Sequence, residues 1–233
     1  MKRMIKKLSF ALMLCCIITL NSSIVYSKEI KKFIFSNEMQ EQVNTKIKNE
    51  LNTFAEENGI SIVFDDIKYS IDFNLVNDEE ELNKEIDELI SNIENDLMIN
   101  ISTSTERSLS EISPLSLKNK GSYYIAKVEC AVPAIGIAWI NQDFTASCGG
   151  EMINGITLLG SSYKTGGSIS SWKHVRSWYE ISGNRKYAQI NIKGVLTYLF
   201  KGSNLDMSAT FMETVKVNNN NQLIHVCYDE YPK

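Results

Sequence analysis

The apolar residues of this chain change their spacing part of the way along. Between residues 28 and 101 they recur mainly at intervals of three and four, and from residue 122 onward they mostly alternate with polar residues. The first spacing is typical of amphipathic helices and the second of half-buried strands. The pattern therefore predicts an α+β N-terminal unit followed by an all-β region that forms an antiparallel sandwich or barrel.

The N-terminal region contains two helical stripes. The first stripe comprises Met39, Val43, Ile47, Leu51 and Phe54, and the second comprises Leu82, Ile86, Leu89, Ile90, Ile93 and Leu97. Gly59 ends the first helix, because glycine readily takes the left-handed conformation after a last helical turn. We expect the second helix to begin with Asn77 as its N-cap and Glu80 three residues later, a capping-box arrangement.

Two short alternating segments lie between these stripes, at residues 60–64 and 69–75, and Asp65-Asp66 is suited to a turn between them. The order α-β-β-α predicts a small acidic α+β domain over residues 28–101. A run rich in Ser and Thr follows, with Pro114 inside it, which predicts a linker over residues 102–121. Exposed connectors are also where proteolysis concentrates. The linker is therefore either permanent or cut near Arg107, which would make residues 28–107 a pro-region.

The C-terminal region, residues 122–233, alternates in seven or eight segments separated by Gly and Asn turns. Its most apolar stretch runs from Ala131 to Ile140. We interpret residues 134–140 as a buried strand, because the run is too short to cross a bilayer as a helix. A hairpin that inserts into a membrane is the alternative interpretation of this stretch.

The first 27 residues have the features of a secretory signal peptide. A start with four positive charges precedes an apolar run from Leu8 to Leu20, and Val25-Tyr26-Ser27 follows. We expect cleavage after Ser27 and secretion of the remaining chain. The abundance of Lys, Asn, Ile and Ser is typical of AT-rich bacterial genes.

The net charge of −4 hides an asymmetry between the two regions. Residues 28–107 carry eight basic and nineteen acidic side chains, a net of −11, whereas residues 108–233 carry twelve and nine, a net of +3. The acidic region either docks on the basic one or simply presents solvated helix faces. No cluster of Lys and Arg resembles a nucleic-acid-binding patch, so we expect no nucleic-acid partner.

Three cysteines remain after signal cleavage: Cys130, Cys148 and Cys227. An exported protein meets oxidising conditions, so one disulfide and one free thiol are expected. We predict that Cys130 pairs with Cys148, because both lie in neighbouring predicted strands. The alternative is that all three are reduced and buried.

One strand carries a candidate ligand-binding face. Trp172, His174, Arg176 and Trp178 recur at every second residue, so a regular strand would point all four side chains the same way. Arginine beside indole rings is suited to hold a phosphate, a carboxylate or a sugar. Cross-strand packing of the aromatic rings is the simpler explanation of the same pattern.

Little in the sequence indicates catalysis. The chain has two histidines, and it lacks a nucleophile elbow, a phosphate-binding glycine loop and the HExxH motif. His225 and Cys227 are not clustered with further ligands, so we expect no catalytic residue, no metal and no cofactor. The sequence favours a secreted, non-enzymatic bacterial protein that binds a surface ligand or partner protein through its β domain. The alternatives are an antimicrobial or toxin-like protein with an acidic pro-region, and a secreted hydrolase.

Overall fold

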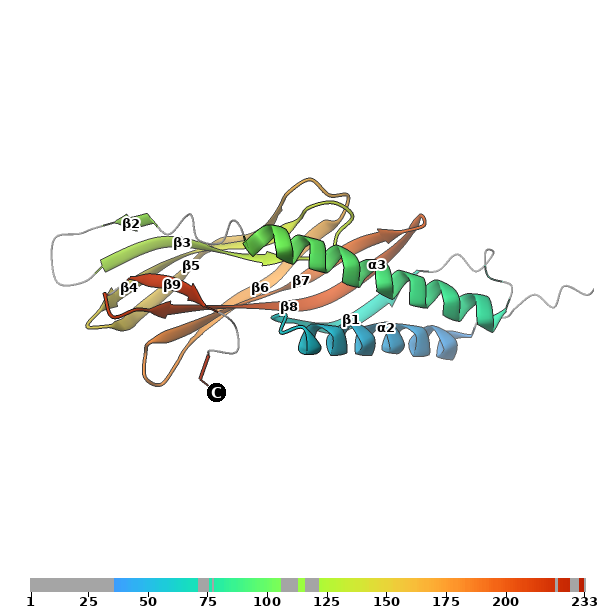
Figure 1. Ribbon diagram of the computed structural model, residues 1–233, viewed down its shortest axis with the longest axis horizontal. Helices are drawn as coiled ribbons and strands as arrows, with labels where there is room; N and C mark the ends of the chain where they lie inside the picture. Colours follow the sequence, from blue (N-terminus) through green and yellow to red (C-terminus); the bar gives the residue numbers. More distant parts are fainter. Residues whose placement is uncertain are drawn as a thin grey trace, which may run out of the picture. The chain divides into compact units, whose positions relative to one another are not determined.

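The computed structural model describes residues 36–70, 76, 78–105, 113–115, 122–220, 222–226 and 231–232. The predicted signal peptide lies outside these residues. An N-terminal segment with two helices precedes long antiparallel strands, which confirms the predicted fold class (Figure 1). The described strands form two open sheets, so the sandwich rather than the barrel is the observed arrangement. All of the described residues belong to one compact unit.

Helix α2 spans Asn37–Glu57 and helix α3 spans Glu79–Thr105. The apolar stripe predicted for α3 is confirmed, because all six of its residues are at most 4% exposed. The stripe predicted for α2 is largely confirmed, since its three central residues are buried and its first and last are half-buried. The sequence pattern therefore identifies the helix faces that enter the core.

Both helices begin at a capping side chain. Ser36 accepts a hydrogen bond from the backbone N–H of Met39, and Asp78 Oδ1 accepts one from the backbone N–H of Glu81 at 2.9 Å. The predicted N-cap, Asn77, is thus one residue too early, because the Asp78 carboxylate serves instead. Helix α3 also continues to Thr105, so residues 102–105 of the predicted linker are helical.

Strand β1 spans Ile62–Tyr69 without interruption, which contradicts the predicted turn at Asp65-Asp66. Its register against strand β8 (Ser203–Val217) shifts between Phe64 and Asp66, so the extra residue forms a bulge instead of a turn. The remainder of the second predicted strand, residues 71–75, lies outside the described residues.

Helix α2 lies beside β1 (Figure 1), and polar side chains of the helix cover the open edge of this strand. Asn52 donates to the backbone C=O of Phe64 at 3.0 Å and accepts from its N–H at 2.8 Å. Asn44 accepts from the backbone N–H of Tyr69, and Gln40 donates to the C=O of the same residue. These side chains satisfy backbone groups that an edge strand would otherwise leave open to another chain.

The nine described strands make a five-stranded and a four-stranded antiparallel sheet. The five-stranded sheet has the order β1-β8-β7-β6, with β9 also paired to β8, and contains β6 (Ser171–Ile181), β7 (Tyr187–Phe200) and β9 (Leu223–Val226). The four-stranded sheet has the order β2-β3-β4-β5, over Ser113–Leu115, Ser122–Ala131, Trp139–Gly149 and Met152–Thr165. Strand β1 comes from the region predicted as a separate domain at 28–101, and it shares a sheet with strands of the region 122–233.

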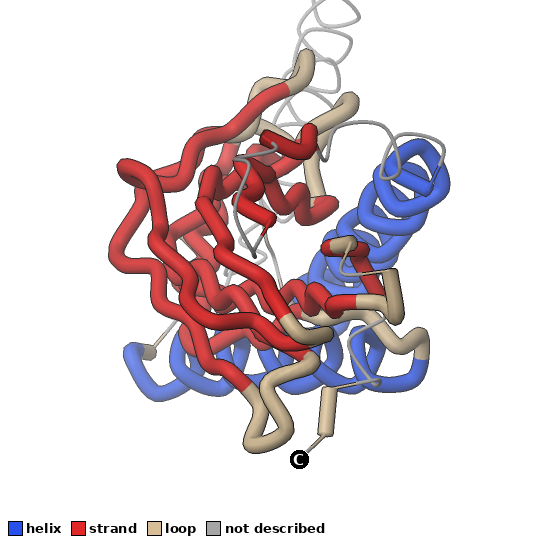
Figure 2. Tube along the Cα trace, turned by 90° about the vertical axis from the view of Figure 1, so that its left-hand side faces the viewer, coloured by secondary structure: helices blue, strands red, loops and turns tan. Residues whose placement is uncertain are grey.

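The inner face of the five-stranded sheet packs against the helices at one end and against the four-stranded sheet at the other (Figure 1), and Figure 2 shows the helices beside the strands in the end-on view. At the helical end, the Tyr198 hydroxyl donates to Asp96 of α3 at 2.7 Å, and the Tyr69 hydroxyl donates to Glu85 at 2.9 Å. Burial is the main cause that raises the pKa of Asp96. Four inward residues of β8 are fully buried: Leu205, Met207, Ala209 and Phe211.

Part of the acidic charge of the N-terminal region docks on the rest of the chain. Lys201 Nζ lies 2.8 Å from a Glu88 oxygen, and Lys193 Nζ lies 2.8 Å from an Asp65 oxygen. Each pair joins the net-negative region to the net-positive one. Exposed pairs of this kind are worth about 0.2–1 kcal/mol each, so they orient the contact more than they stabilise it.

The apolar run between β3 and β4 is not the buried strand that the sequence analysis predicts. β3 ends at Ala131 and β4 begins at Trp139, and a loop joins them. Asn100 of α3 is fully buried and holds this loop, since its amide donates to the C=O of Val132 and accepts from the N–H of Ala138. The loop thus depends on an α3 side chain that no local pattern reveals.

Candidate functional site

A bulge in β6 divides the predicted ligand-binding face. The register of β6 against β7 shifts between His174 and Arg176, so that His174 lies opposite Gly194 and Arg176 lies opposite Lys193. Neighbouring residues of a strand point to opposite faces, and cross-strand partners point to the same face. Trp172 and His174 therefore point inward, while Arg176 and Trp178 point outward. The prediction that the four share one face is wrong.

The inward pair, Trp172 and His174, forms a partly buried polar network with Ser162 of β5. The Trp172 indole N–H donates to Ser162 Oγ at 3.1 Å, and Ser162 Oγ lies 2.6 Å from His174 Nδ1. The backbone N–H of Ser162 also donates to Nδ1, at 3.3 Å, so Nδ1 is an acceptor and the imidazole proton is assigned to Nε2. Ser162 is 5% exposed, so a substrate has little access to this Ser–His contact.

A second inward cluster brings together Cys130, Glu213 and His225. His225 Nε2 contacts a carboxylate oxygen of Glu213, and this bond is the main cause that raises the His225 pKa. Burial, and then the nearby Glu213 carboxylate, raise the pKa of the Cys130 thiol well above its ordinary value. A thiol kept protonated is a poor nucleophile and a poor metal ligand.

The structure also tests the predicted cysteine and metal chemistry. Cys130 and Cys148 are both free and buried, and their strand partners are Ile140 and Ser122 respectively. Cys130 thus lies eight positions along β4 from Cys148, about 26 Å at the usual rise of a strand, so the predicted disulfide is wrong. Within the described ranges no group of three His, Cys, Asp or Glu side chains is placed to hold a metal. Cys227 lies outside them.

The outward pair, Arg176 and Trp178, lies on the solvent-facing side of the five-stranded sheet. Arg176 is exposed, and its Cζ lies 4.5 Å from the centroid of the Trp178 ring, a cation–π contact. The Trp178 indole N–H donates to Glu180 Oε1 at 3.3 Å. Of the four residues predicted to form one ligand-binding face, Arg176 and Trp178 thus contact each other on the outer face of the sheet. Trp172 and His174 lie on its inner face.

Two buried polar groups that the sequence analysis missed lie on the same outer face. Asn191 is directly opposite Trp178, is 3% exposed, and its Nδ2 has no hydrogen-bond partner. Thr214 is diagonal to Asn191 on β8, and its fully buried Oγ1 also has none. We call Arg176, Trp178, Asn191 and Thr214 the Trp178 surface. A buried polar group without a partner is rare enough to need an explanation.

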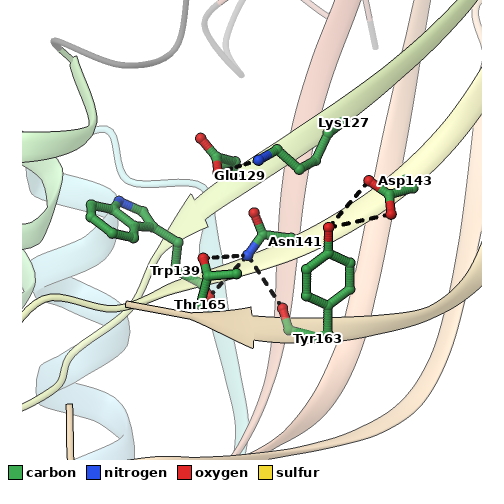
Figure 3. Close-up of polar contacts among 7 residues, drawn as sticks. All are labelled: Lys127, Glu129, Trp139, Asn141, Asp143, Tyr163 and Thr165. Atoms are coloured by element: carbon green, nitrogen blue, oxygen red, sulfur yellow. Dashed lines mark hydrogen bonds and ion pairs between the residues drawn. The ribbon is translucent and has the colours of Figure 1, made fainter. Parts of the chain in front are cut away.

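The outer face of the four-stranded sheet carries a second polar cluster (Figure 3). Asn141 of β4 lies between Glu129 of β3 and Tyr163 of β5, and the next row along the strands places Asp143 beside Lys127. Lys127 Nζ is 2.7 Å from a Glu129 oxygen, and the Tyr163 hydroxyl is 3.3 Å from both Asp143 oxygens. We call these five residues the Asn141 cluster. The Asn141 cluster was not predictable from the sequence, because its members come from three strands.

Comparison with known proteins does not assign this chain to a family. Its architecture places it among α+β proteins in which long antiparallel strands form a sandwich beside two helices. No protein-family model, no curated protein and no solved structure matches the chain. Among the described helices, neither has the length and apolar character needed to span a bilayer. A functional proposal therefore depends on the two outer surfaces alone.

Proposed function

We propose that this is a secreted, non-enzymatic bacterial protein that binds a surface ligand through the Trp178 surface of its β region. The supporting observation is the position of a buried, unpartnered amide nitrogen, Asn191 Nδ2, directly beside the half-buried Trp178 and the exposed Arg176 that contacts it. A ligand oxygen that accepts from Asn191 would satisfy a group that otherwise costs about 1–3 kcal/mol to leave unpaired.

The chemistry of the surface favours an acceptor-rich ligand. The Arg176 guanidinium offers several N–H donors in a planar fork, which suits carboxylate and phosphate groups. The apolar ring of Trp178 suits the face of a sugar. An anionic glycan combines both features, so cell-wall teichoic acid and host glycans that carry carboxylates are the ligand class that we propose.

Binding to immobilised cell-wall teichoic acid and to hyaluronan tests this proposal. Trp178→Ala and Arg176→Ala should each weaken the binding, whereas Lys84→Ala, which removes an exposed cation from α3, should leave it unchanged. Trp178→Phe keeps an aromatic ring and should retain part of the affinity. Equal binding by all four variants, each with an unchanged melting temperature, would reject the Trp178 surface as the site.

Secretion is a separate part of the proposal, and it depends on the charged start and apolar run of residues 1–27. The intact mass of the protein recovered from culture medium tests it. A species that begins at Lys28 is the expected result. Recovery of the chain only from cells, with Met1 still present, would contradict both the cleavage site and the localisation.

A further inference from the structure

We propose that the Asn141 cluster is a second binding site, which takes the ammonium or guanidinium group of a basic side chain on a partner protein. The Asn141 cluster lies on the four-stranded sheet, whereas the Trp178 surface lies on the five-stranded sheet. The second site therefore does not depend on the proposed function. It is derived from a buried acceptor, an excess of negative charge and the apolar side chains that surround them.

The buried acceptor is the side-chain oxygen of Asn141. The residue is fully buried, and its Nδ2 contacts Thr165 Oγ1 at 2.8 Å and the carbonyl oxygens of Trp139 and Tyr163 at 3.2 and 3.4 Å. Carbonyl oxygens only accept, so these contacts fix which end of the amide is the nitrogen. Figure 3 shows the opposite end, Oδ1, on the side of Glu129, and it has no partner.

Such an acceptor needs a donor. Leaving a buried carbonyl-type oxygen unpaired costs about 1–3 kcal/mol, which an incoming N–H group would recover. Gln142, the next residue of β4, differs in this respect, since it is bonded through both ends of its amide, to Ser177 and to backbone oxygens. The outward-facing Asn141 thus lacks the bond to its side-chain oxygen that its neighbour makes.

The charge around Asn141 favours a cationic donor. Glu129 and Asp143 carry two negative charges, and Lys127, paired with Glu129, supplies one positive charge. Asp143 accepts from the Tyr163 hydroxyl only at the long distance of 3.3 Å. An ammonium or guanidinium group placed between Asn141 Oδ1 and the two carboxylates would add charge-assisted hydrogen bonds, which are stronger than neutral ones.

The neighbouring side chains favour a basic side chain of a protein over a free ion. Leu159 lies beside Asp143, and Ile125 lies beside Lys127 one row along, and these two are 40% and 45% exposed. The ring of Tyr163 is also 40% exposed. Apolar side chains next to a charged group suit the alkyl stem of lysine or arginine and apolar residues around it. We therefore assign the site to a basic residue flanked by apolar residues.

A titration of the isotope-labelled mature chain, residues 28–233, with the peptide acetyl-Ile-Arg-Ile-amide tests the inference. The side-chain NH₂ signal of Asn141, followed by NMR, should shift on binding. The peptide acetyl-Ile-Gln-Ile-amide should bind about two- to fivefold more weakly, the range expected for one partly exposed ion pair. Added NaCl should weaken the binding of the arginine peptide and leave the binding of the glutamine peptide unchanged.

Two variants remove charge without removing hydrogen-bond capacity. Asp143→Asn and Glu129→Gln should each weaken the binding of the arginine peptide severalfold and leave the binding of the glutamine peptide unchanged. Glu151→Gln, which removes the same charge at the β4–β5 turn, is the matched control and should bind as the wild type does. Trp178→Ala should also bind normally, which separates this site from the proposed function.

Three outcomes would overturn the inference. Equal affinity for the two peptides would show apolar contact only. Shifts of the Asn141 signal on addition of calcium chloride, but not of the arginine peptide, would indicate an inorganic cation site. If neither addition moves the signal in a chain whose melting temperature is that of the wild type, the acceptor is satisfied by an ordered water, and no basic side chain binds.

Discussion

The indole ring of Trp172 occupies the space in which a side chain at Gly194 would lie. A Cβ atom on Gly194 would come within 2.3 Å of two carbons of this ring. The same ring meets Phe211 edge-on, with 5.6 Å between the ring centroids. Gly194 is therefore required because two neighbouring strands place backbone and indole in direct contact.

We expect Gly194→Ala to reduce the free energy of unfolding by about 1–3 kcal/mol, because the added methyl group forces the indole out of its packed position. Urea denaturation followed by tryptophan fluorescence measures this. Gly155→Ala is the control, since its Cβ would meet only Ser147 Oγ, at an ordinary 3.5 Å. An equal loss of stability in both variants would show a general cost of strand glycine replacement instead.

Replacement of Asn52 should expose the edge of β1. Asn52→Ala leaves the N–H and C=O of Phe64 without their side-chain partner, which should cost about 1–3 kcal/mol and increase aggregation. Thermal denaturation and light scattering measure the two effects. Asn83→Ala, on the exposed face of α3, should alter neither. An unchanged Asn52→Ala protein would mean that water substitutes for the amide.

The pro-region hypothesis also has a testable consequence. If a protease site is inserted between residues 106 and 112 and cut, we expect the two fragments to remain together, because β1 is hydrogen-bonded to β8 along its whole length. Residues 108–233 produced alone should aggregate, since Met207 and Phe211 would lose their strand partners Ile67 and Ile62, and most of β8 would become an open edge. Size-exclusion chromatography measures both. A soluble, monomeric 108–233 fragment that separates after cleavage would favour a removable pro-region.

The Glu213–His225 contact predicts a pH dependence. Its bond to Glu213 raises the His225 pKa in the folded protein above the value of an unfolded chain. The stabilisation is thus complete below the ordinary pKa of histidine, about 6.5, and is lost as the pH rises through the pKa of His225 in the folded protein. The difference in unfolding free energy between wild type and His225→Gln should therefore shrink as the pH rises above about 6.5. A difference that grows with pH would refute the assignment.

Both described cysteines should behave as protected thiols. Burial raises the pKa of Cys148 to about 11 and that of Cys130 well above its ordinary value, so a thiol reagent should label neither in the native protein. In denaturant without a reducing agent both should be alkylated, which intact-mass and peptide analysis would show. A peptide pair linked through Cys130 and Cys148 would contradict the strand register.

The parts of this fold that the sequence predicts are those that depend on local spacing. The stripe from Leu82 to Leu97 follows from helical periodicity alone, and so do the strands that alternate toward the core. The bulges in β1 and β6 were not predictable in this way, because the positions of Asp65 and Val175 depend on pairing with β8 and β7. One extra residue at Val175 was enough to separate His174 from Arg176.

The candidate sites were less predictable than the fold for the same reason. Arg176 and Trp178 are two residues apart, so the sequence places them together. Asn191 comes from the neighbouring strand, and the Asn141 cluster draws on three strands whose register is fixed only when the sheet forms. In the sequence, Asn141 begins a short polar run and Asn191 alternates with apolar residues as an ordinary strand residue does, so each is a weak signal that gains meaning only from burial without a full set of partners.

The pairing of β1 with β8 gives the chain a late step in its assembly. Asp65 and Thr210, which bond across these strands, are 145 positions apart, so nearly the whole polypeptide must be present before β1 has a partner. Contacts between such distant positions slow folding, because a long loop must close before they form. We therefore expect a slow final phase in which helix α2 and strand β1 join a sheet whose other strands, β6 to β8, are linked by short connections.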